Sequence, residues 1–355
     1  MGVGRSSSRA TIRDVATAAR VSPTTVSHAL NGKGRIHPRT RARIQQVAER
    51  MGYQANRLAV GLRSGRSGVQ ALWLPLGPDA TANDTLALDY YMRLASATAT
   101  AVFGHGDVVM LLPPVLEGQD LTAVAVDGAI VIDPGEGDRR IEALRALEIP
   151  CVTIERNPID PKDPWCVTSD TGHHVECLLE HLSAQGAQRI ALLVPEAFGA
   201  WAEEQRAAYR SLALDHRQER LTRPVALRPA FESALRVVRA MLRWQRPPDA
   251  IVIGAERFVP GTMRALADAG RVVPNDLLVA VAVDGNYARG SNPPLTAVDL
   301  QPERQATAAA ELLRNRLDGL APSGPRTISG ILQVRTSSQR PGRRQPQTGK
   351  FLGVS

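Results

Sequence analysis

Short side chains, most of them polar, gather at one place in this 355-residue sequence. They belong to Pro23, Thr24, Thr25, Ser27 and His28. Hydroxyl and imidazole groups can hydrogen-bond phosphates or base edges, and small side chains let a backbone approach closely. We therefore expect these residues to form the outer face of a short helix that fits the major groove of DNA.

Two helices joined by a tight turn are expected to position this face. Thr11 and Asp14 have the spacing of a capping box, which predicts a first helix that starts there and stops at Arg20. Ser22 is the expected N-cap of the second helix, and Pro23 suits its first position. Apolar residues recur at helical spacing in both: Ile12, Val15, Ala16, Ala19, Val26, Ala29 and Leu30. A generic helical hairpin would have the same spacing, so the charge of the segment has to distinguish the two interpretations.

The N-terminal segment carries the positive charge of the chain. Residues 1–66 contain 13 Lys and Arg and two acidic residues, whereas the rest contains 30 basic and 33 acidic residues. A basic segment attached to a near-neutral body is typical of phosphate binding, because neutralised phosphates release counterions. Binding at a membrane surface fits less well, since the segment lacks a large Trp, Phe and Leu face. A third helix over Pro38–Met51 would complete a small DNA-binding domain over residues 10–54.

Residues 55–68 have the pattern of a hinge helix and a linker. Asn56 is an expected N-cap, Ala59 and Leu62 follow at helical spacing, and Gly and Ser residues come next. A helix of this length is unstable alone. We therefore expect it to fold only against DNA and a second copy of the chain.

From Val69 onward, short apolar runs alternate with longer helical patterns. The runs are residues 71–76, 108–113, 129–132, 151–154, 190–194, 250–254 and 277–283. This alternation predicts parallel sheets with helices on both faces. We expect a bilobed α/β domain over residues 69–334, in which the Pro-rich segment Asp160–Trp165 crosses between the lobes. Ligands in such folds bind at the carboxyl ends of the strands.

Several classes of protein are not indicated. The cysteines Cys151, Cys166 and Cys177 form no C-x-x-C pair, so neither disulfides nor thiol redox chemistry is expected. His173, Cys177 and His181 share one predicted helix face, but a tetrahedral metal site needs a fourth ligand, and we expect no metal or other cofactor. The motifs of phosphoryl transfer, zinc proteolysis and serine hydrolysis are absent, so we predict no enzymatic activity.

The chain ends are also informative. No segment has the apolar length of a transmembrane helix, and the N-terminus lacks the apolar core of a secretory signal, so we expect a cytoplasmic, nucleoid-associated protein without membrane contact. Residues 335–355 form a basic tail whose Pro, Gly, Gln and Ser content cannot bury a core. We expect this tail to be disordered.

Short motifs run through the N-terminal segment: I-x-D-V-A from Ile12, V-S-x-x-T-V-S from Val21, T-R-x-R-I from Thr40 and N-R-x-A-x-x-L from Asn56. By these motifs the segment resembles the DNA-binding head of the LacI/GalR (lactose-repressor) family of transcription regulators. The resemblance implies a set of DNA-binding residues: Thr11, Ser22, Pro23, Thr24, Thr25, Ser27, His28, Asn31, Asn56, Ala59 and Leu62.

The resemblance also implies roles within that set. In the family, the positions of Pro23, Thr24 and His28 read base edges, and those of Thr25 and Ser27 lie beside phosphates. A leucine at the position of Leu62 wedges into the minor groove, as an apolar side chain that unstacks bases can do. This chain departs from the family at His28, where arginine is common, and at Ala55, where proline is usual.

Residues 69–334 resemble the family's periplasmic-binding-protein-like sensor domain through IPCVTIER, HLSAQGAQRIALL and PPLTAV. The resemblance implies a ligand site formed by Tyr90, Tyr91, Glu155, Gln205, Phe231 and Asp284. Gln205 replaces a frequent ligand-binding arginine, and Ala255 a frequent asparagine, so the pocket has departed from the sugar-binding pattern. The alternative, that Phe231 and the tyrosines are ordinary core residues, stays open because aromatic side chains often simply pack.

Head, hinge and sensor together predict a homodimeric transcriptional regulator. A repressor is the favoured form, although the sequence does not fix the sign of the response. It would bind a pseudo-palindromic operator in double-stranded DNA, and a sugar-like small molecule between the lobes would modulate its affinity. Two alternatives remain: a regulator that is blind to small molecules, and a solute-binding protein or enzyme on the same bilobed fold.

Overall fold

The computed structural model describes residues 10–30, 34–53, 66–75, 88–112, 125–196, 199–215 and 221–340. The chain divides into two compact units, residues 1–68 and residues 69–355. Each unit is described by itself below.

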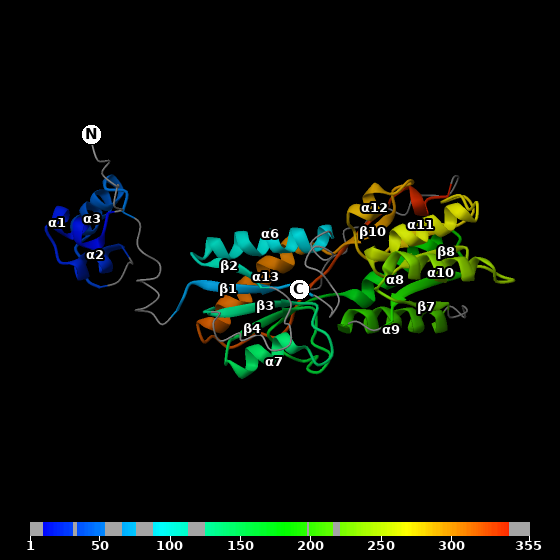
Figure 1. Cartoon of the computed structure of the whole chain (residues 1–355), viewed down its shortest axis with the longest axis horizontal. Helices are drawn as coiled ribbons and strands as arrows, with labels where there is room; N and C mark the ends of the chain where they lie inside the picture. Colours follow the sequence, from blue (N-terminus) through cyan, green and yellow to red (C-terminus); the bar gives the residue numbers. More distant parts are fainter. Residues whose placement is uncertain are drawn as a thin grey trace, which may run out of the picture. The chain divides into compact units, whose positions relative to one another are not determined.

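The first unit contains the helices α1 (Ile12–Ala19), α2 (Pro23–Leu30) and α3 (Pro38–Arg50), which pack against one another (Figure 1). The predicted capping box is present, since Thr11 Oγ1 accepts from the Asp14 amide and Asp14 Oδ2 accepts from the Thr11 amide at 2.7 Å. Arg20 adopts a left-handed conformation, with φ 52°, and ends α1 where the sequence predicted. The small core is made of Val15, Ala16, Ala19, Val26, Ala29, Ile44, Val47 and Ala48.

Local signals also fix the two other helices. Ser22 Oγ accepts from the Thr25 amide at 3.1 Å, so the predicted N-cap of α2 is confirmed. After α3 the chain turns at Gly52, whose φ of 60° lets the Tyr53 amide donate back to the Ala48 carbonyl. The turn lets Tyr53 pack against the core of the unit.

The second unit begins with a parallel six-stranded sheet, in the order β11-β5-β4-β3-β1-β2. Its strands are β1 (Val69–Trp73), β2 (Val108–Leu112), β3 (Gly128–Ile132), β4 (Cys151–Ile154), β5 (Cys166–Ser169) and β11 (Arg326–Ile328). Alternate strand residues face opposite layers: Leu72 and Ile130 pack against α6 (Asp89–Gly104) and α13 (Pro302–Leu317), whereas Ala71 and Val131 pack against α7 (Arg139–Ala146). Figure 1 shows α6 and α7 on opposite sides of this sheet, which we call the first lobe.

The second lobe is built around another six-stranded sheet, in the order β12-β10-β9-β8-β6-β7. Its strands are β6 (Ile190–Pro195), β7 (Thr222–Val225), β8 (Ala250–Ile253), β9 (Leu278–Val281), β10 (Thr296–Asp299) and the antiparallel β12 (Ile331–Gln333). One face is covered by α8 (Thr171–Ala184) and α9 (Gly199–Asp215). The other is covered by α10 (Ala230–Leu242), α11 (Val259–Asp268) and α12 (Asn286–Gly290). A 3₁₀ turn over Glu256–Phe258 precedes α11.

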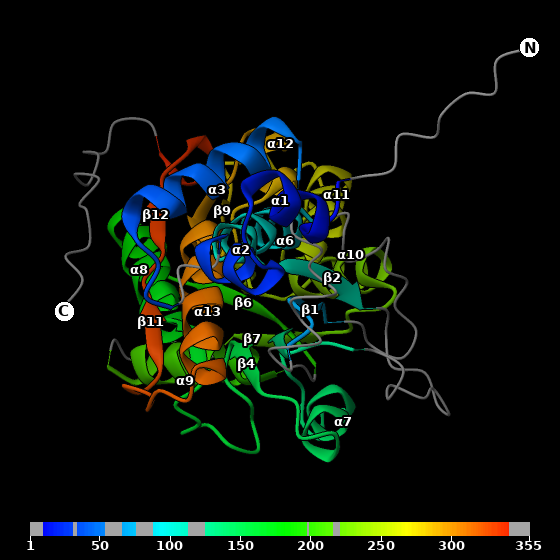
Figure 2. The same ribbon diagram turned by 90° about the vertical axis from the view of Figure 1, so that its left-hand side faces the viewer.

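Three segments of the chain cross between the lobes: β5 leads into α8, β10 leads into α13, and β11 leads into β12. Figure 2 shows β11 and β12 in succession along one side of the unit. The predicted crossing at Asp160–Trp165 is wrong, because this segment joins β4 to β5 within the first sheet. Its turn is closed locally, for example by the bridge between Asn157 and Asp160.

The predicted boundary of the tail at residue 335 is wrong. Strand β12 pairs with β10 and delivers Arg335 beside Asp284, and the residues that follow form a 3₁₀ turn over Thr336–Ser338. Ser337 and Ser338 are fully buried, and Ser337 Oγ donates to the Val279 carbonyl at 2.6 Å. Residues 335–340 therefore belong to the second lobe, while the rest of the predicted tail lies outside the described residues.

Truncation tests this boundary. Removing everything after Val334 takes away the Arg335 partner of the buried Asp284 carboxylate and the buried serines, and should lower the free energy of unfolding by about 2–4 kcal/mol. Removing only the residues after Arg340 should change it by less than about 0.5 kcal/mol. Urea unfolding of the two truncated chains and the full chain measures both effects. Equal stability of all three would contradict the assignment.

Candidate functional site

The exposed side of α2 is smaller than the sequence predicted. Ser22, Pro23, Thr24 and His28 are exposed, and Thr25 is half-buried, with its hydroxyl 2.8 Å from Ser22 Oγ. Ser27 is buried, only 8% exposed, because it lies on the part of the helix that faces the core together with Val26 and Ala29. The predicted outer position of Ser27 is therefore wrong.

The remaining predicted DNA contacts are placed as follows. Thr11 is exposed and caps α1. Asn31, Asn56, Ala59 and Leu62 lie outside the described residues. Their contacts with DNA stay predictions.

His28 lies against the loop that leads to α3. A Cβ atom on Gly34, which has φ of 74°, would lie 3.0 Å from His28 Nδ1. Glycine at this position therefore leaves room for the imidazole and accepts a backbone conformation that other residues rarely adopt. The close contact limits the ring to few orientations, as a base-reading side chain requires.

The described part of the head has a strongly basic surface. Six arginines are exposed there: Arg13, Arg20, Arg35, Arg39, Arg43 and Arg50. Asp14, one of two acidic residues in this part, accepts hydrogen bonds from Thr11, which lower the pKa of its carboxyl group. The arrangement suits a polyanion such as the phosphate backbone of DNA.

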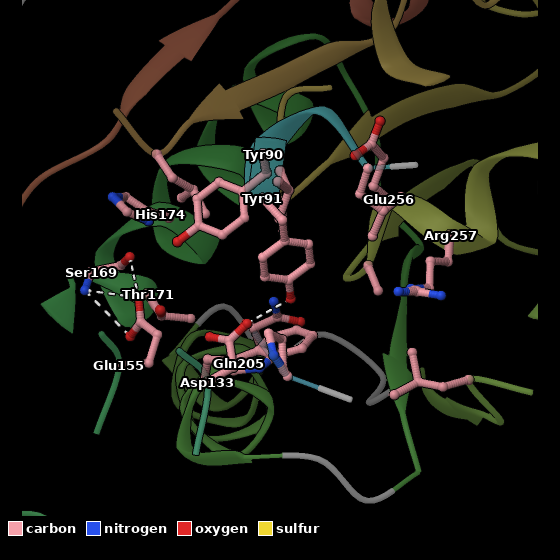
Figure 3. Close-up of a pocket in the computed structure, with 18 of the residues that line it drawn as sticks. Tyr90, Tyr91, Asp133, Glu155, Ser169, Thr171, His174, Gln205, Glu256 and Arg257 are labelled. Atoms are coloured by element: carbon pink, nitrogen blue, oxygen red, sulfur yellow. Dashed lines mark hydrogen bonds between the residues drawn. The ribbon is translucent and has the colours of Figure 1, made fainter. Parts of the chain in front are cut away.

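A cavity of about 300 Å³ lies between the two lobes, at the carboxyl ends of the strands of both sheets (Figure 3). The first lobe contributes Tyr90, Tyr91, Asp133 and Glu155, and the second contributes Trp201, Gln205, Glu256 and Arg257, among others. Of the predicted ligand residues, Tyr90, Tyr91, Glu155 and Gln205 line this cavity.

The two other predicted ligand residues lie elsewhere. Phe231 belongs to the first turn of α10, is 41% exposed and does not line the cavity. Asp284 is buried but accepts two hydrogen bonds from Arg335, at 2.9 and 2.8 Å, and is also absent from the cavity lining. The sequence could not indicate this pairing, because Arg335 had been predicted to lie in a tail.

Asp133 is a cavity residue that the sequence reasoning missed. It follows β3 directly and accepts a hydrogen bond of 2.6 Å from the Tyr91 hydroxyl (Figure 3). The guanidinium of Arg140, itself buried, donates to the carbonyls of Leu74 and Ile132 at the ends of β1 and β3. Asp133 is the first polar residue after a buried strand, and this position was the signal that could have identified it.

A buried relay of hydrogen bonds runs from α6 to Glu155. The Tyr90 hydroxyl donates to Gln305 Oε1 at 2.7 Å, and Gln305 Nε2 donates to Ser169 Oγ at 2.8 Å. Ser169 in turn donates to Glu155 through its hydroxyl at 2.5 Å and its amide at 3.1 Å (Figure 3). The relay joins α6, α13 and the crossing at Ser169 to one carboxyl group in the cavity wall.

The wall of the second lobe retains unused hydrogen-bond acceptors. Gln205 donates through Nε2 to the Gly254 carbonyl at 3.1 Å, but its buried Oε1 has no partner among the described residues. Glu256 accepts from the Tyr287 amide at 2.9 Å through Oε1, and its buried Oε2 has no described partner either. Arg228 and Arg257 also line the cavity, and both already interact with other parts of the protein.

Burial governs the protonation of these groups. Burial raises the pKa of Asp133 to about 6 and that of Glu155 to about 7, and the negative charge of Asp133 contributes to the second shift. Burial lowers the pKa of His174 to about 4, so this residue is neutral at pH 7 and accepts a hydrogen bond from the Gly330 amide at 2.7 Å. The cavity therefore combines aromatic faces with oxygen acceptors, which suits a ligand rich in hydroxyl donors.

The helix that carries His173, Cys177 and His181 uses these side chains within the protein. His173 Nε2 lies 3.4 Å from Cys177 Sγ, and His181 Nε2 lies 2.6 Å from Ser338 Oγ. Within the described ranges, no group of three or more His, Cys, Asp or Glu residues could hold a metal ion. No helix in those ranges has both the length and the apolar character that crossing a membrane requires.

Known families match both units. The family of bacterial regulatory proteins named lacI matches residues 11–56, and the periplasmic binding protein-like domain matches residues 179–338. The chain is 30% identical over 275 residues to the maltose regulon regulatory protein MalI of Escherichia coli (strain K12), covering 74% of this chain and 76% of MalI. It is 26% identical over 276 residues to the transcriptional regulator AglR of Rhizobium meliloti (strain 1021), covering 75% of each.

Solved structures show the same fold. A lac repressor dimer bound to operator and the anti-inducer ONPF has a TM-score of 0.72 and 21% identity, covering 94% of this chain and all of that one. A complex of the transcriptional regulator CelR with cellobiose has a TM-score of 0.70 and 23% identity, covering 93% and 100%. The chain therefore belongs to the LacI family of bacterial transcriptional regulators, with a helix-turn-helix head and a periplasmic-binding-protein-like domain.

The raised pKa of Asp133 predicts an unusual dependence of stability on pH. Because the folded state holds this proton more tightly than the unfolded chain, whose aspartate has a pKa of about 3.9, stability should fall as pH rises from about 4 to about 6. Asp133→Asn should flatten this decline and raise the free energy of unfolding at pH 7.5 by about 2 kcal/mol.

Urea unfolding between pH 4 and pH 8 measures the effect. Asp268→Asn is the matched control, because contacts with Arg239 lower rather than raise the pKa of that exposed carboxyl group. A profile of Asp133→Asn that runs parallel to that of the unmodified chain would refute the assignment.

Proposed function

We propose that this chain is a homodimeric repressor whose affinity for a pseudo-palindromic operator is set by a sugar-like effector in the interlobe cavity. The observation that carries the proposal is a cavity lined by buried oxygen acceptors that have no partner among the described residues, in a chain that also has a basic helix-turn-helix head. Action in the cytoplasm at the nucleoid, without catalysis, is part of the same proposal.

The chemistry of the cavity supports a hydroxyl-rich, uncharged effector. Gln205 and Glu256 offer acceptors, Asp133 and Glu155 offer carboxyl groups, and two tyrosines and Trp201 offer aromatic surface. Hydroxyl groups of a sugar can donate to such oxygens while its apolar face packs on an aromatic ring. The relatives named above for maltose and cellobiose agree with a carbohydrate.

A ligand-blind regulator is the second candidate, favoured by the replacement of the family's arginine and asparagine by Gln205 and Ala255. It is less well supported, because buried acceptors without partners cost free energy that a merely structural interior would avoid. A solute-binding protein or an enzyme would have no use for the head.

Regulation would follow from the crossings between the lobes. A ligand that contacts both lobes stabilises the closed arrangement by its difference in affinity between the two states. The crossings hold polar contacts of their own, such as the hydrogen bond from Gln301 Nε2 to the Ser329 carbonyl. In the proposed dimer, Asn56, Ala59 and Leu62 of paired hinge helices would then bind or leave the minor groove.

An apolar surface on the first lobe supports self-association. Met92 and Phe103 of α6 and Val108, Met110 and Leu111 of the edge strand β2 are all exposed, and Phe103 is 67% exposed. Exposed apolar side chains that gather on adjacent elements are typical of a surface that another protein covers. We assign this surface to the second copy of the chain.

Two measurements test the proposal as a whole. Selection of DNA sequences by the full chain should enrich one site with two-fold symmetry, and thermal-shift screening should reveal stabilisation by neutral sugars. Absence of any preferred sequence would exclude the repressor. A preferred sequence without stabilisation by any sugar or polyol would instead favour the ligand-blind regulator.

His28→Ala tests base reading within the selected site. Loss of a base contact should weaken binding to that site by about 1–3 kcal/mol while leaving binding to unrelated DNA nearly unchanged. Fluorescence anisotropy on both DNAs gives the two affinities. Equal loss on both would mean that His28 makes no base-specific contact. Arg50→Ala is the control, since loss of one exposed charge should weaken binding to both DNAs alike.

Phe103→Glu tests the subunit surface. A carboxylate within an apolar contact is costly to desolvate, so the dimer should dissociate at least about tenfold more readily. Sedimentation equilibrium measures the dissociation constant. Val272→Glu, at another exposed apolar residue, is the control and should not change it. A dimer that withstands Phe103→Glu would place the interface elsewhere.

A further inference from the structure

An ion pair joins the two lobes at one edge of the cavity. Arg289 of α12, in the second lobe, donates through NH2 to Asp89 Oδ2 at 2.6 Å, and Asp89 is the first residue of α6 in the first lobe. The next residues of α6 are Tyr90 and Tyr91, whose side chains lie in the cavity wall. Any movement of Asp89 relative to Arg289 is therefore a movement of the cavity wall.

Arg289 is held between carboxylates of both lobes. Its NH1 group lies 3.4 Å from Asp284 Oδ2, and Asp284 is fixed by its two hydrogen bonds from Arg335. Arg289 NH2 also donates to Asn286 Oδ1 at 3.1 Å. The guanidinium is thus oriented by its own lobe toward Asp89, the carboxylate of the other lobe that pairs with it among the described residues.

The position of α12 in turn depends on a cavity residue. Glu256 accepts from the amide of Tyr287, in the first turn of α12. The carboxyl group of Glu256 lies so close to Gly285 that a Cβ atom there would be only 2.1 Å from Oε1, and the nearest atoms it would meet all belong to Glu256. Glycine at position 285 therefore makes room for this carboxyl group and not for a special backbone angle.

We propose that Arg289 is a positioning residue that latches the two lobes in the arrangement of this structure, and that Glu256 sets the latch by holding the start of α12. If a hydrogen-bond donor of the ligand binds Glu256 Oε2, the position of Arg289 would change through Tyr287. The position of α6 would then change through Asp89. The regulatory meaning of this latch rests on the proposed function, whereas the latch itself can be measured without effector or operator.

A second ion pair between the lobes provides a comparison. Arg156, which follows Glu155, lies 3.3 Å from Glu204 of α9. It uses different elements from the Asp89 pair and shares no residue with it. The opening of the lobes caused by losing this pair should therefore add to the opening caused by losing the latch. The effects of two substitutions within the latch should not add.

The experiment measures the distance between the lobes in the full chain without ligand. Spin labels are attached to cysteines that replace the exposed residues Glu142 of α7 and Arg236 of α10, in a chain in which the half-buried Cys151 is serine. Pulsed electron paramagnetic resonance then gives the distribution of distances. The unmodified latch should give one dominant distance, and Asp89→Asn or Arg289→Met should increase the longer-distance population about two- to fivefold.

The variants are combined to isolate the pair. The double variant Asp89→Asn/Arg289→Met should have the same longer-distance population as either single variant. Glu204→Gln combined with Asp89→Asn should have a larger longer-distance population than Glu204→Gln or Asp89→Asn alone. Salt at about 0.5 M should move the unmodified chain toward the variants, because the pair is partly exposed and is screened. Asp268→Asn, which removes ion pairs to Arg239 and Arg264 inside the second lobe, should leave the distances unchanged.

Gly285→Ala tests the link to Glu256. Among the described residues, the atoms nearest to a Cβ atom at position 285 all belong to Glu256, so the added methyl group should displace the Glu256 carboxyl group and open the lobes as much as Arg289→Met. Distances in Gly285→Ala that equal those of the unmodified chain would overturn the link. Unchanged distances in both latch variants, or an equal change in Asp268→Asn, would overturn the latch. None of these outcomes depends on whether a sugar is bound or which DNA is recognised.

Discussion

Burial of carboxyl groups at the carboxyl ends of β3 and β4 is the constraint on which the sensor unit depends. Asp133 and Glu155 are nearly inaccessible, and buried carboxyl groups persist only when hydrogen bonds compensate for lost water. Tyr91 donates a hydrogen bond to Asp133. Ser169, which is linked to Tyr90 through Gln305, donates to Glu155. These donors come from α6, α13 and the first crossing, so satisfying two acids fixes how those elements meet.

The burial of polar groups also determines on which wall of the cavity a ligand can form new hydrogen bonds. In the cavity wall of the first lobe, Asp133 and Glu155 accept hydrogen bonds from the protein, whereas Gln205 Oε1 and Glu256 Oε2 in the wall of the second lobe have no partner among the described residues. A ligand therefore has most to gain at the second lobe while it packs against tyrosines of the first. Because α12 starts beside Glu256 and carries Arg289, contacts at that wall are transmitted to the edge where the lobes meet.

Much of this could be predicted from local sequence. The capping box at Thr11, the N-cap at Ser22 and the apolar runs of β1 to β4, β6, β8 and β9 depend on neighbouring residues, and they appear where expected. Strands such as β5 and β7 are short and contain polar residues or proline, so they lack a distinct pattern. Asp284 and Phe231 were misplaced because their surroundings depend on residues far away in the sequence. Arg335 became the partner of Asp284 only once β12 had joined the second sheet.

We expect occupancy of the interlobe cavity to change the affinity of the chain for DNA. Anisotropy titration of the selected operator, with and without a saturating sugar that raises the melting temperature of the chain, measures this coupling directly. Operator affinity should change by at least about fivefold when the sugar is bound, and sugar affinity should change by the same factor when operator is present. Operator affinity that is identical with and without bound sugar would contradict this expectation.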